Sequence, residues 1–167
     1  MANEIERKFF INSIDIPDEI LAEITHSGTH IFIRQGYLSV DDPEERVREK
    51  TYPDGKTVYV RTIKSGSGLS REENEWDISQ EEFEDAWEKT EGKRVEKTRY
   101  KYPMVGGLVA EIDFYSNDLI GLVTAEVEFP DLRSAQAFVP PKWFRKDVTE
   151  DSRFKNKNLA INGRPDI

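Results

Sequence analysis

The chain has 167 residues, enough for one domain with its own core, and we treat 1–167 as a single domain. Its formal net charge of −9 argues against a nucleic-acid partner, because nucleic-acid binding normally needs a basic field. The absence of cysteine excludes disulfides, thiolate metal sites and a cysteine nucleophile. No apolar run approaches membrane-spanning length and no signal-peptide pattern is present, so we expect a cytoplasmic protein without a membrane partner.

Most of the predicted elements are β-strands. Eight segments combine β-propensity, alternation and turn signals at their ends: 3–12, 30–40, 45–52, 56–64, 70–77, 93–102, 109–115 and 122–129. Helical spacing predicts a short amphipathic helix over 17–25, and a capping box at Ser79 and Glu82 begins another. A third short helix is predicted over 131–138, and the tail is predicted to be loop and short helix. The pattern favours an antiparallel barrel.

Charged residues recur at two-residue spacing in six of these segments. Residues two apart on a strand project from the same face, so each set forms a row on one side of the sheet. An inner wall with acidic rows beside basic rows would bind metal cations and a polyanion together. A solvated outer face explains any single row equally well. The rows are Glu4, Glu6 and Lys8; Arg46 and Arg48; Glu73 and Glu75; Lys97, Arg99 and Lys101; Glu111 and Asp113; and Glu126 and Glu128.

Nearly the whole chain resembles one known family. The start, Glu4-Ile5-Glu6-Arg7-Lys8-Phe9, is similar to the ExExK signature of the CYTH superfamily, the triphosphate tunnel metalloenzymes. The resemblance implies an α+β, mainly β fold: a closed antiparallel eight-stranded tunnel barrel with a charged interior and a few short outer helices. Further matching blocks follow in the family's order: Gln35-Gly36-Tyr37-Leu38, Arg46-Val47-Arg48, Thr62-Ile63-Lys64-Ser65-Gly66, Arg71-Glu72-Glu73-Asn74-Glu75, Lys97-Thr98-Arg99-Tyr100, Glu111-Ile112-Asp113, Ala125-Glu126-Val127-Glu128-Phe129 and, near the end, Val148-Thr149 with Asn158-Leu159-Ala160.

The resemblance implies a metal site, because in this family the inward-facing acids bind Mg²⁺ or Mn²⁺. Carboxylate oxygens together with substrate phosphates are the ligands that Mg²⁺ prefers. A second, transient metal is expected near Glu4. The residues assigned to metal by the resemblance are Glu4, Glu6, Asp113, Glu126 and Glu128.

The basic rows match the family's phosphate-binding positions. Arginine suits bidentate contact with phosphate oxygens, and lysine supplies a compact charge. Arg61 is at odd parity to Lys64 and is assigned to the surface, while Arg153 and Lys155 are basic enough to contribute. The substrate-binding residues that the resemblance implies are Lys8, Arg46, Arg48, Lys64, Lys97 and Arg99. Residues whose parity also allows them to line the tunnel are Arg71, Glu73, Glu75, Lys101 and Glu111.

Three residues are predicted to act in catalysis: Glu4, Lys8 and Tyr37. Tyr37 matches a tyrosine for which the family suggests a proton-acceptor role. An ordinary tyrosine pKa near ~10 makes a poor base at neutral pH, so a structural aromatic at the tunnel wall is the alternative. His26 and His30 have no matching acid and are interpreted as ordinary histidines.

The resemblance implies metal-dependent hydrolysis of inorganic triphosphate to pyrophosphate and phosphate, with a small-molecule triphosphate as the partner. Thiamine triphosphatase and adenylyl cyclase activity on ATP use the same tunnel and remain alternatives. An alternative of another class is a non-catalytic module that binds polyphosphate or a nucleoside triphosphate. A homodimer is common in such families and is expected on that ground alone.

Overall fold

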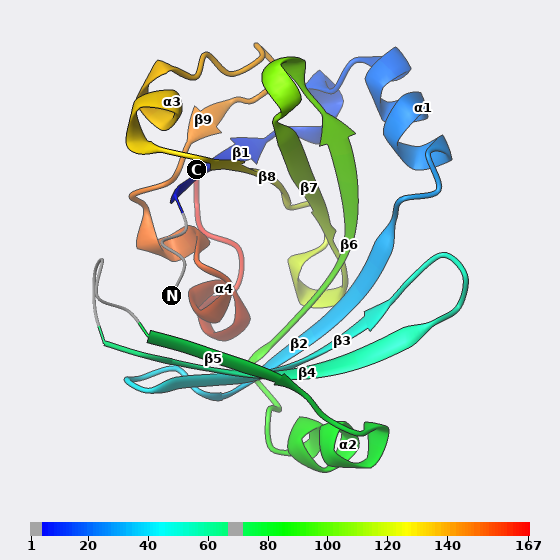
Figure 1. Ribbon diagram of the computed structural model, residues 1–167, viewed down its shortest axis with the longest axis vertical. Helices are drawn as coiled ribbons and strands as arrows, with labels where there is room; N and C mark the ends of the chain where they lie inside the picture. Colours follow the sequence, from blue (N-terminus) through cyan, green and yellow to red (C-terminus); the bar gives the residue numbers. More distant parts are fainter. Residues whose placement is uncertain (1–4, 67–71) are drawn as a thin grey trace.

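The computed structural model describes residues 5–66 and 72–167 (Figure 1). In these ranges nine strands form one antiparallel sheet in the order β5-β4-β3-β2-β6-β7-β8-β1-β9. The eight predicted strands are confirmed, and the two-residue β9 was not predicted. The strands are β1 (Ile5–Ile11), β2 (Ile31–Ser39), β3 (Glu44–Thr51), β4 (Thr57–Ser65), β5 (Glu72–Asp77), β6 (Arg94–Pro103), β7 (Val109–Tyr115), β8 (Val123–Phe129) and β9 (Lys146–Asp147).

Four α-helices accompany the sheet in the described ranges: α1 (Asp18–His26), α2 (Gln80–Glu88), α3 (Leu132–Ala137) and α4 (Asn156–Asn162). The predicted helices are confirmed, and two begin at side-chain caps. Ser79 Oγ accepts a hydrogen bond from the Glu82 amide at 3.1 Å, and Asp131 Oδ1 accepts one from the Ser134 amide at 2.7 Å. Within the described residues, no helix has both the length and the apolar character needed to cross a membrane.

The described strands do not close into a hydrogen-bonded ring, so the predicted closed barrel is not confirmed. The sheet begins at β5 and ends at β9, which pairs with Phe9 and Phe10 of β1. The sheet instead bends strongly, so that β2 to β5 lie opposite β1, β7 and β8, with α4 between the two halves (Figure 1). The bend gives the sheet an inner and an outer face.

The largest apolar core lies on the outer face. Phe9, Ile112 and Val127 are all nearly fully buried there, beside Trp143 and Phe144 of the C-terminal segment. Ile24 of α1 and Ala135 of α3 belong to the same core. Apolar burial at ~25 cal/mol per Å² is the dominant favourable term in folding, so the outer face carries most of the packing energy. The charged rows on the same strands therefore face inward.

A separate apolar cluster lies at one end of the inner face. It joins Phe10 of β1 and Tyr115 of β7 to Phe154 and to Leu159 of α4. Phe154 ends the short 3-10 helix Ser152–Phe154 that precedes α4. The C-terminal segment is thereby anchored inside the bend of the sheet and forms part of the inner surface.

Candidate active site

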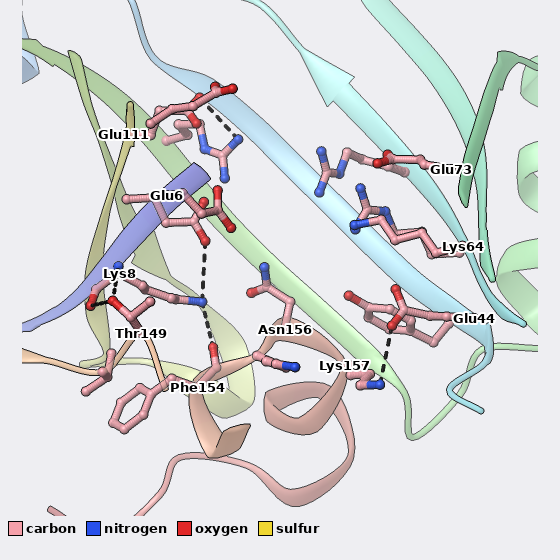
Figure 2. Close-up of a pocket in the computed structure, with 18 of the residues that line it drawn as sticks. Glu6, Lys8, Glu44, Lys64, Glu73, Glu111, Thr149, Phe154, Asn156 and Lys157 are labelled. Atoms are coloured by element: carbon pink, nitrogen blue, oxygen red, sulfur yellow. Dashed lines mark hydrogen bonds and ion pairs between the residues drawn. The ribbon is translucent and has the colours of Figure 1, made fainter. Parts of the chain in front are cut away.

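The bend of the sheet encloses a cavity of about 370 Å³ whose lining is mostly charged (Figure 2). The strands and the C-terminal segment both contribute to it. The lining residues that lie on the strands are Glu6, Lys8, Tyr37, Glu44, Arg46, Arg48, Lys64, Glu73, Glu75, Arg99, Glu111, Glu126 and Glu128. The polar residues that the C-terminal segment adds are Thr149, Asp151, Lys155, Asn156 and Lys157.

Arg46 and Arg48 of β3 form the basic side. They are paired in the sheet with Tyr37 and Gln35 of β2, so all four side chains share the inner face. Arg48 Nε donates to Gln35 Oε1 at 2.6 Å, whereas Arg46 Nε is buried and has no hydrogen-bond partner in the described part of the chain. Burial and the neighbouring Arg46 charge lower the pKa of Arg48 to about 10. Arg46 and Arg48 are two adjacent guanidinium groups that repel each other, so a bound anion would stabilise both.

Carboxylates form the opposite side. Glu6 of β1 is paired with Glu128 of β8, and Glu111 of β7 is paired with Glu126 of β8. Like charges opposite each other on neighbouring strands repel, and a cation between them would relieve this. Carboxylate oxygens suit a hard divalent cation, so the donor chemistry fits Mg²⁺ or Mn²⁺. Across residues 5–66 and 72–167, no three such groups already converge to metal-binding geometry.

Asp113 is paired with two cations behind the cavity wall. Its carboxylate lies 2.9 Å from Lys97 Nζ and accepts from Arg99 Nε at 2.8 Å and Arg99 Nη2 at 3.0 Å. Burial alone would raise the pKa of Asp113, but Lys97 and Arg99 hold it well below its usual range. Burial lowers the pKa of Lys97 to about 7 against the pull of Asp113. Of these three residues Arg99 lines the cavity, so Asp113 holds it from behind.

Glu111 reaches the cavity where its strand neighbour Asp113 does not. Sequence parity placed both on the same face, the family resemblance made that face the inner one, and the register in the sheet puts Glu111 beside Glu126. The metal role predicted for Asp113 and the phosphate-binding role predicted for Lys97 stay predictions. The acidic residues that the structure brings together on the cavity lining are Glu6, Glu111, Glu126 and Glu128.

Lys8 links β1 to the C-terminal segment (Figure 2). Its Nζ donates to the Phe154 carbonyl at 2.6 Å and lies 3.7 Å from Glu126 Oε1. Its backbone amide donates to Thr149 Oγ1 at 3.0 Å. The lysine ammonium is therefore held at the edge of the acidic side, facing the cavity.

Sequence reasoning missed several lining residues from outside the charged rows. Glu44 is nearly buried, and its Oε1 lies 3.6 Å from Lys157 Nζ of α4. Asn156 accepts a hydrogen bond from the Tyr115 hydroxyl at 2.8 Å. The family resemblance covers Val148-Thr149, and the charge of Lys155 indicated a contribution, and all of these residues line the cavity. The sequence gave no signal for Asn156 or Lys157, because a loop and a short helix lack the two-residue period that marks one face of a strand.

The remaining predicted positions divide into several groups. Lys101 lines a neighbouring groove that shares Glu111 and Glu128 with the main cavity, and Glu73 and Glu75 line the cavity from β5. Arg61 pairs with Glu45 away from the cavity, as predicted. Glu4 and Arg71 lie outside the described residues.

The last positions predicted from the sequence are two basic residues near the C-terminus and the two histidines. Arg153 is exposed and pairs with Asp151 at 2.7 Å, whereas Lys155 lines the cavity. His26 Nδ1 contacts the Ala22 carbonyl at 2.7 Å, and the His30 ring packs against Phe32.

Two proteins of similar sequence and one solved structure are named inorganic triphosphatase. No family model matches the chain. An inorganic triphosphatase from Nitrosomonas europaea is 44% identical over 160 residues, which cover 95% of this chain and 97% of that protein. An inorganic triphosphatase from Acetivibrio thermocellus is 32% identical, with 97% and 96% covered. The crystal structure of an inorganic triphosphatase matches with a TM-score of 0.71 at 41% identity and 96% coverage of both chains.

A more distant structure shares the fold. It is a proposed adenylyl cyclase from Hippeastrum with a dominant triphosphatase activity, matched at a TM-score of 0.55 and 16% identity over 80% of this chain. The bent sheet and its charged cavity thus define a protein of the CYTH class, which confirms the resemblance found in the sequence. Within that class, the chain belongs to the inorganic triphosphatase family.

Proposed function

We propose that this protein hydrolyses inorganic triphosphate to pyrophosphate and phosphate inside the charged cavity. The observation that carries the proposal is the pair Arg46 and Arg48, which faces the cavity without a carboxylate ion pair in the described part of the chain. Triphosphate is a compact chain of negative charge whose oxygens match guanidinium geometry. The 44% identity to a named inorganic triphosphatase supports the same reaction.

In this proposal the basic residues bind and orient the phosphate chain. Arg46, Arg48 and Arg99 come from β3 and β6, so they contact it from two parts of the sheet. Asp113 keeps Arg99 in one orientation through two hydrogen bonds, which reduces the ordering that substrate must impose. Lys64 adds a further charge from β4.

The carboxylates Glu6, Glu111, Glu126 and Glu128 would hold Mg²⁺ or Mn²⁺ beside the phosphates. The bound cation would neutralise phosphate charge and lower the pKa of a coordinated water. Glu4, assigned to the same role from the sequence, completes the proposed set. These assignments rest on donor chemistry and on the register of β1, β7 and β8.

Catalysis by the chain itself is then positioning and electrostatic stabilisation. Lys8 Nζ is already oriented by the Phe154 carbonyl and by Glu126, so it can stabilise negative charge that develops on a phosphoryl group. The cavity contains no cysteine or histidine among its lining residues, and hydrolysis by water needs neither. The closed tunnel, the homodimer and the cytoplasmic location remain predictions.

The test is phosphate release from inorganic triphosphate, thiamine triphosphate and ATP, each with Mg²⁺, with Mn²⁺ and with chelator. We expect metal-dependent release with a strong preference for inorganic triphosphate. Formation of cyclic AMP from ATP would assign the chain to the cyclases instead. Tight triphosphate binding without turnover under any condition would make the protein a binding module and contradict the proposal.

A further inference from the structure

A buried amide connects the basic side of the cavity to Tyr37. Gln35 and Tyr37 lie two residues apart on β2 and share its inner face, and they are 0% and 1% exposed. Tyr37 lines the cavity, whereas Gln35 lies behind the lining. A fully buried glutamine needs hydrogen-bond partners for both ends of its amide, so the identity of these partners decides how it acts.

The orientation of the Gln35 amide is determined by chemistry. Arg48 Nε can only donate, so the Gln35 atom 2.6 Å from it must be the oxygen. The amide nitrogen is then directed at the Tyr37 hydroxyl, also at 2.6 Å, and this nitrogen can only donate. The Tyr37 oxygen is therefore the acceptor of this bond, and its own proton must be directed elsewhere.

A phenolic proton prefers the plane of the ring, where it has two positions. Because Gln35 donates to the Tyr37 oxygen, the phenolic proton cannot point along that bond. Within the described residues, the Tyr37 hydroxyl makes its hydrogen bond to Gln35 and has no acceptor for its own proton. The hydroxyl belongs to a residue on the cavity lining, beside Arg46 and Arg48.

Burial favours the neutral form of Tyr37. Burial raises the pKa of Tyr37, and Glu44 adds to this, while Arg46 and Arg48 act in the opposite direction. The phenol therefore retains its proton at neutral pH. A protonated phenol can donate a hydrogen bond and cannot accept a proton as a base.

We propose that Gln35 is a positioning residue that holds Tyr37 as a hydrogen-bond donor to a phosphate oxygen of the substrate. This inference rests on the proposed function and specifies how one residue of that site acts. It gives Tyr37 the opposite role from the proton acceptor that the sequence resemblance suggests. Arg48 and Tyr37 would approach the same phosphate chain, with Gln35 fixing both.

The decisive experiment is a double-mutant cycle between Gln35→Glu and Tyr37→Phe, measured as kcat and KM for inorganic triphosphate. Glutamate keeps the shape of the side chain and still accepts a hydrogen bond from Arg48. It also accepts a hydrogen bond from the Tyr37 hydroxyl, which turns that hydroxyl away from the substrate. Hydrogen bonds to charged groups contribute ~1.5–3 kcal/mol, so Tyr37→Phe should lower kcat/KM about 10- to 100-fold. Tyr100→Phe, on the outer core, is the matched control and should keep wild-type rates.

The added charge of glutamate acts in both backgrounds, so the difference between the two penalties isolates the orientation of Tyr37. We expect Gln35→Glu to cost about tenfold more in the wild-type background than in the Tyr37→Phe background. Equal penalties in the two backgrounds, or wild-type rates for Tyr37→Phe, would overturn the inference. Melting temperatures of all variants identify any that lose activity through unfolding.

The pH profile separates a donor from a base. If Tyr37 were a base, the wild-type rate would rise at alkaline pH through an ionisation that Tyr37→Phe lacks. A donor predicts no such difference in the alkaline rise. If the wild type fails to hydrolyse triphosphate at all, the proposed function fails, and the same cycle is measured as equilibrium binding of tripolyphosphate. Additive binding penalties in that cycle would overturn the inference by itself.

Discussion

Arginines on the two faces of three neighbouring strands, β2, β3 and β4, have different environments. On the outer face, Arg34 makes two hydrogen bonds to Glu49 at 2.8 and 3.1 Å, and Arg61 is paired with Glu45. On the inner face, Arg46 and Arg48 have no carboxylate ion pair within the described residues. The outer arginines lie on β2 and β4, and the inner arginines lie on β3 between those two strands. The outer partners Glu49 and Glu45 also lie on β3, so carboxylates are present on the same strand but on its other face.

The contrast indicates which face serves folding and which serves function. Outer charges are neutralised in pairs and cover apolar cores, as with Arg34 over the rings of Phe83 and Trp87. On the inner face Arg99 and Lys8 are paired with carboxylates. Within the described residues, Arg46 and Arg48 have no carboxylate ion pair and would be compensated by a bound polyanion. A folded protein retains such local conflict mainly where function requires it.

The largest effect is expected on the acidic side. Glu128→Ala should abolish metal-dependent phosphate release while leaving the fold intact, because Glu128 is exposed, lines the cavity and is one of the proposed metal ligands. Activity assays with Mg²⁺ and Mn²⁺, together with circular dichroism, measure both halves of this expectation. Glu81→Ala, exposed on α2, is the control. Near-wild-type rates for Glu128→Ala would show that the metal assignment is wrong.

Removal of an inner arginine should have the second-largest effect. Arg48→Ala should lower kcat/KM for inorganic triphosphate about 10²- to 10³-fold, the usual effect of losing one preorganised electrostatic contact. Thermal denaturation should show only a small loss of stability, because the unpaired Gln35 oxygen that remains is offset by relief of repulsion from Arg46 and Arg99. A strong fall in melting temperature with little loss of activity would reverse the assignment of the two faces.

Asp113 tests an inner charge that is already compensated. Asp113→Asn should destabilise the fold by about 3–5 kcal/mol, since it leaves Lys97 and Arg99 without their buried partner. Urea titrations of wild type and variant measure this loss.

The loss should also depend on pH. The folded pKa of Asp113 is depressed, so its stabilisation is complete above the unfolded value near ~3.9 and disappears as pH falls through the folded pKa. The stability difference between wild type and variant should therefore shrink below about pH 4. A difference that is constant from pH 7 to pH 3 would contradict the ion-pair account.

The smallest effect is expected on the outer face. Arg61→Ala breaks a half-exposed pair, so it should change the free energy of unfolding by at most about 1 kcal/mol. Rates with inorganic triphosphate should remain within about twofold of wild type, because Arg61 is not on the cavity lining. A loss of activity like that of Arg48→Ala would remove the distinction between the faces.

The sequence predicted the strands and their same-face charged rows because a strand alternates faces at every residue. Arg61 and Lys64, for example, were correctly placed on opposite faces by parity alone. Only the family resemblance indicated that the charged rows face inward. Parity does not report burial, so it could not distinguish Asp113, which is enclosed by two cations, from Glu111, which reaches the cavity. Roles for Asn156 and Lys157 and the open sheet edges depend on tertiary packing, which leaves no periodic signal in the sequence.

The central claim is that the basic residues Arg46 and Arg48 on the inner face bind a polyphosphate. It is tested most directly by the melting temperature of the metal-free protein titrated with tripolyphosphate, in wild type, Arg48→Ala and Arg61→Ala. A ligand at 100 times its Kd stabilises the folded state by about 2.7 kcal/mol, which gives a clear upward shift. We predict this shift for wild type and Arg61→Ala and its loss in Arg48→Ala. Equal shifts in all three proteins, or none in wild type, would contradict the claim.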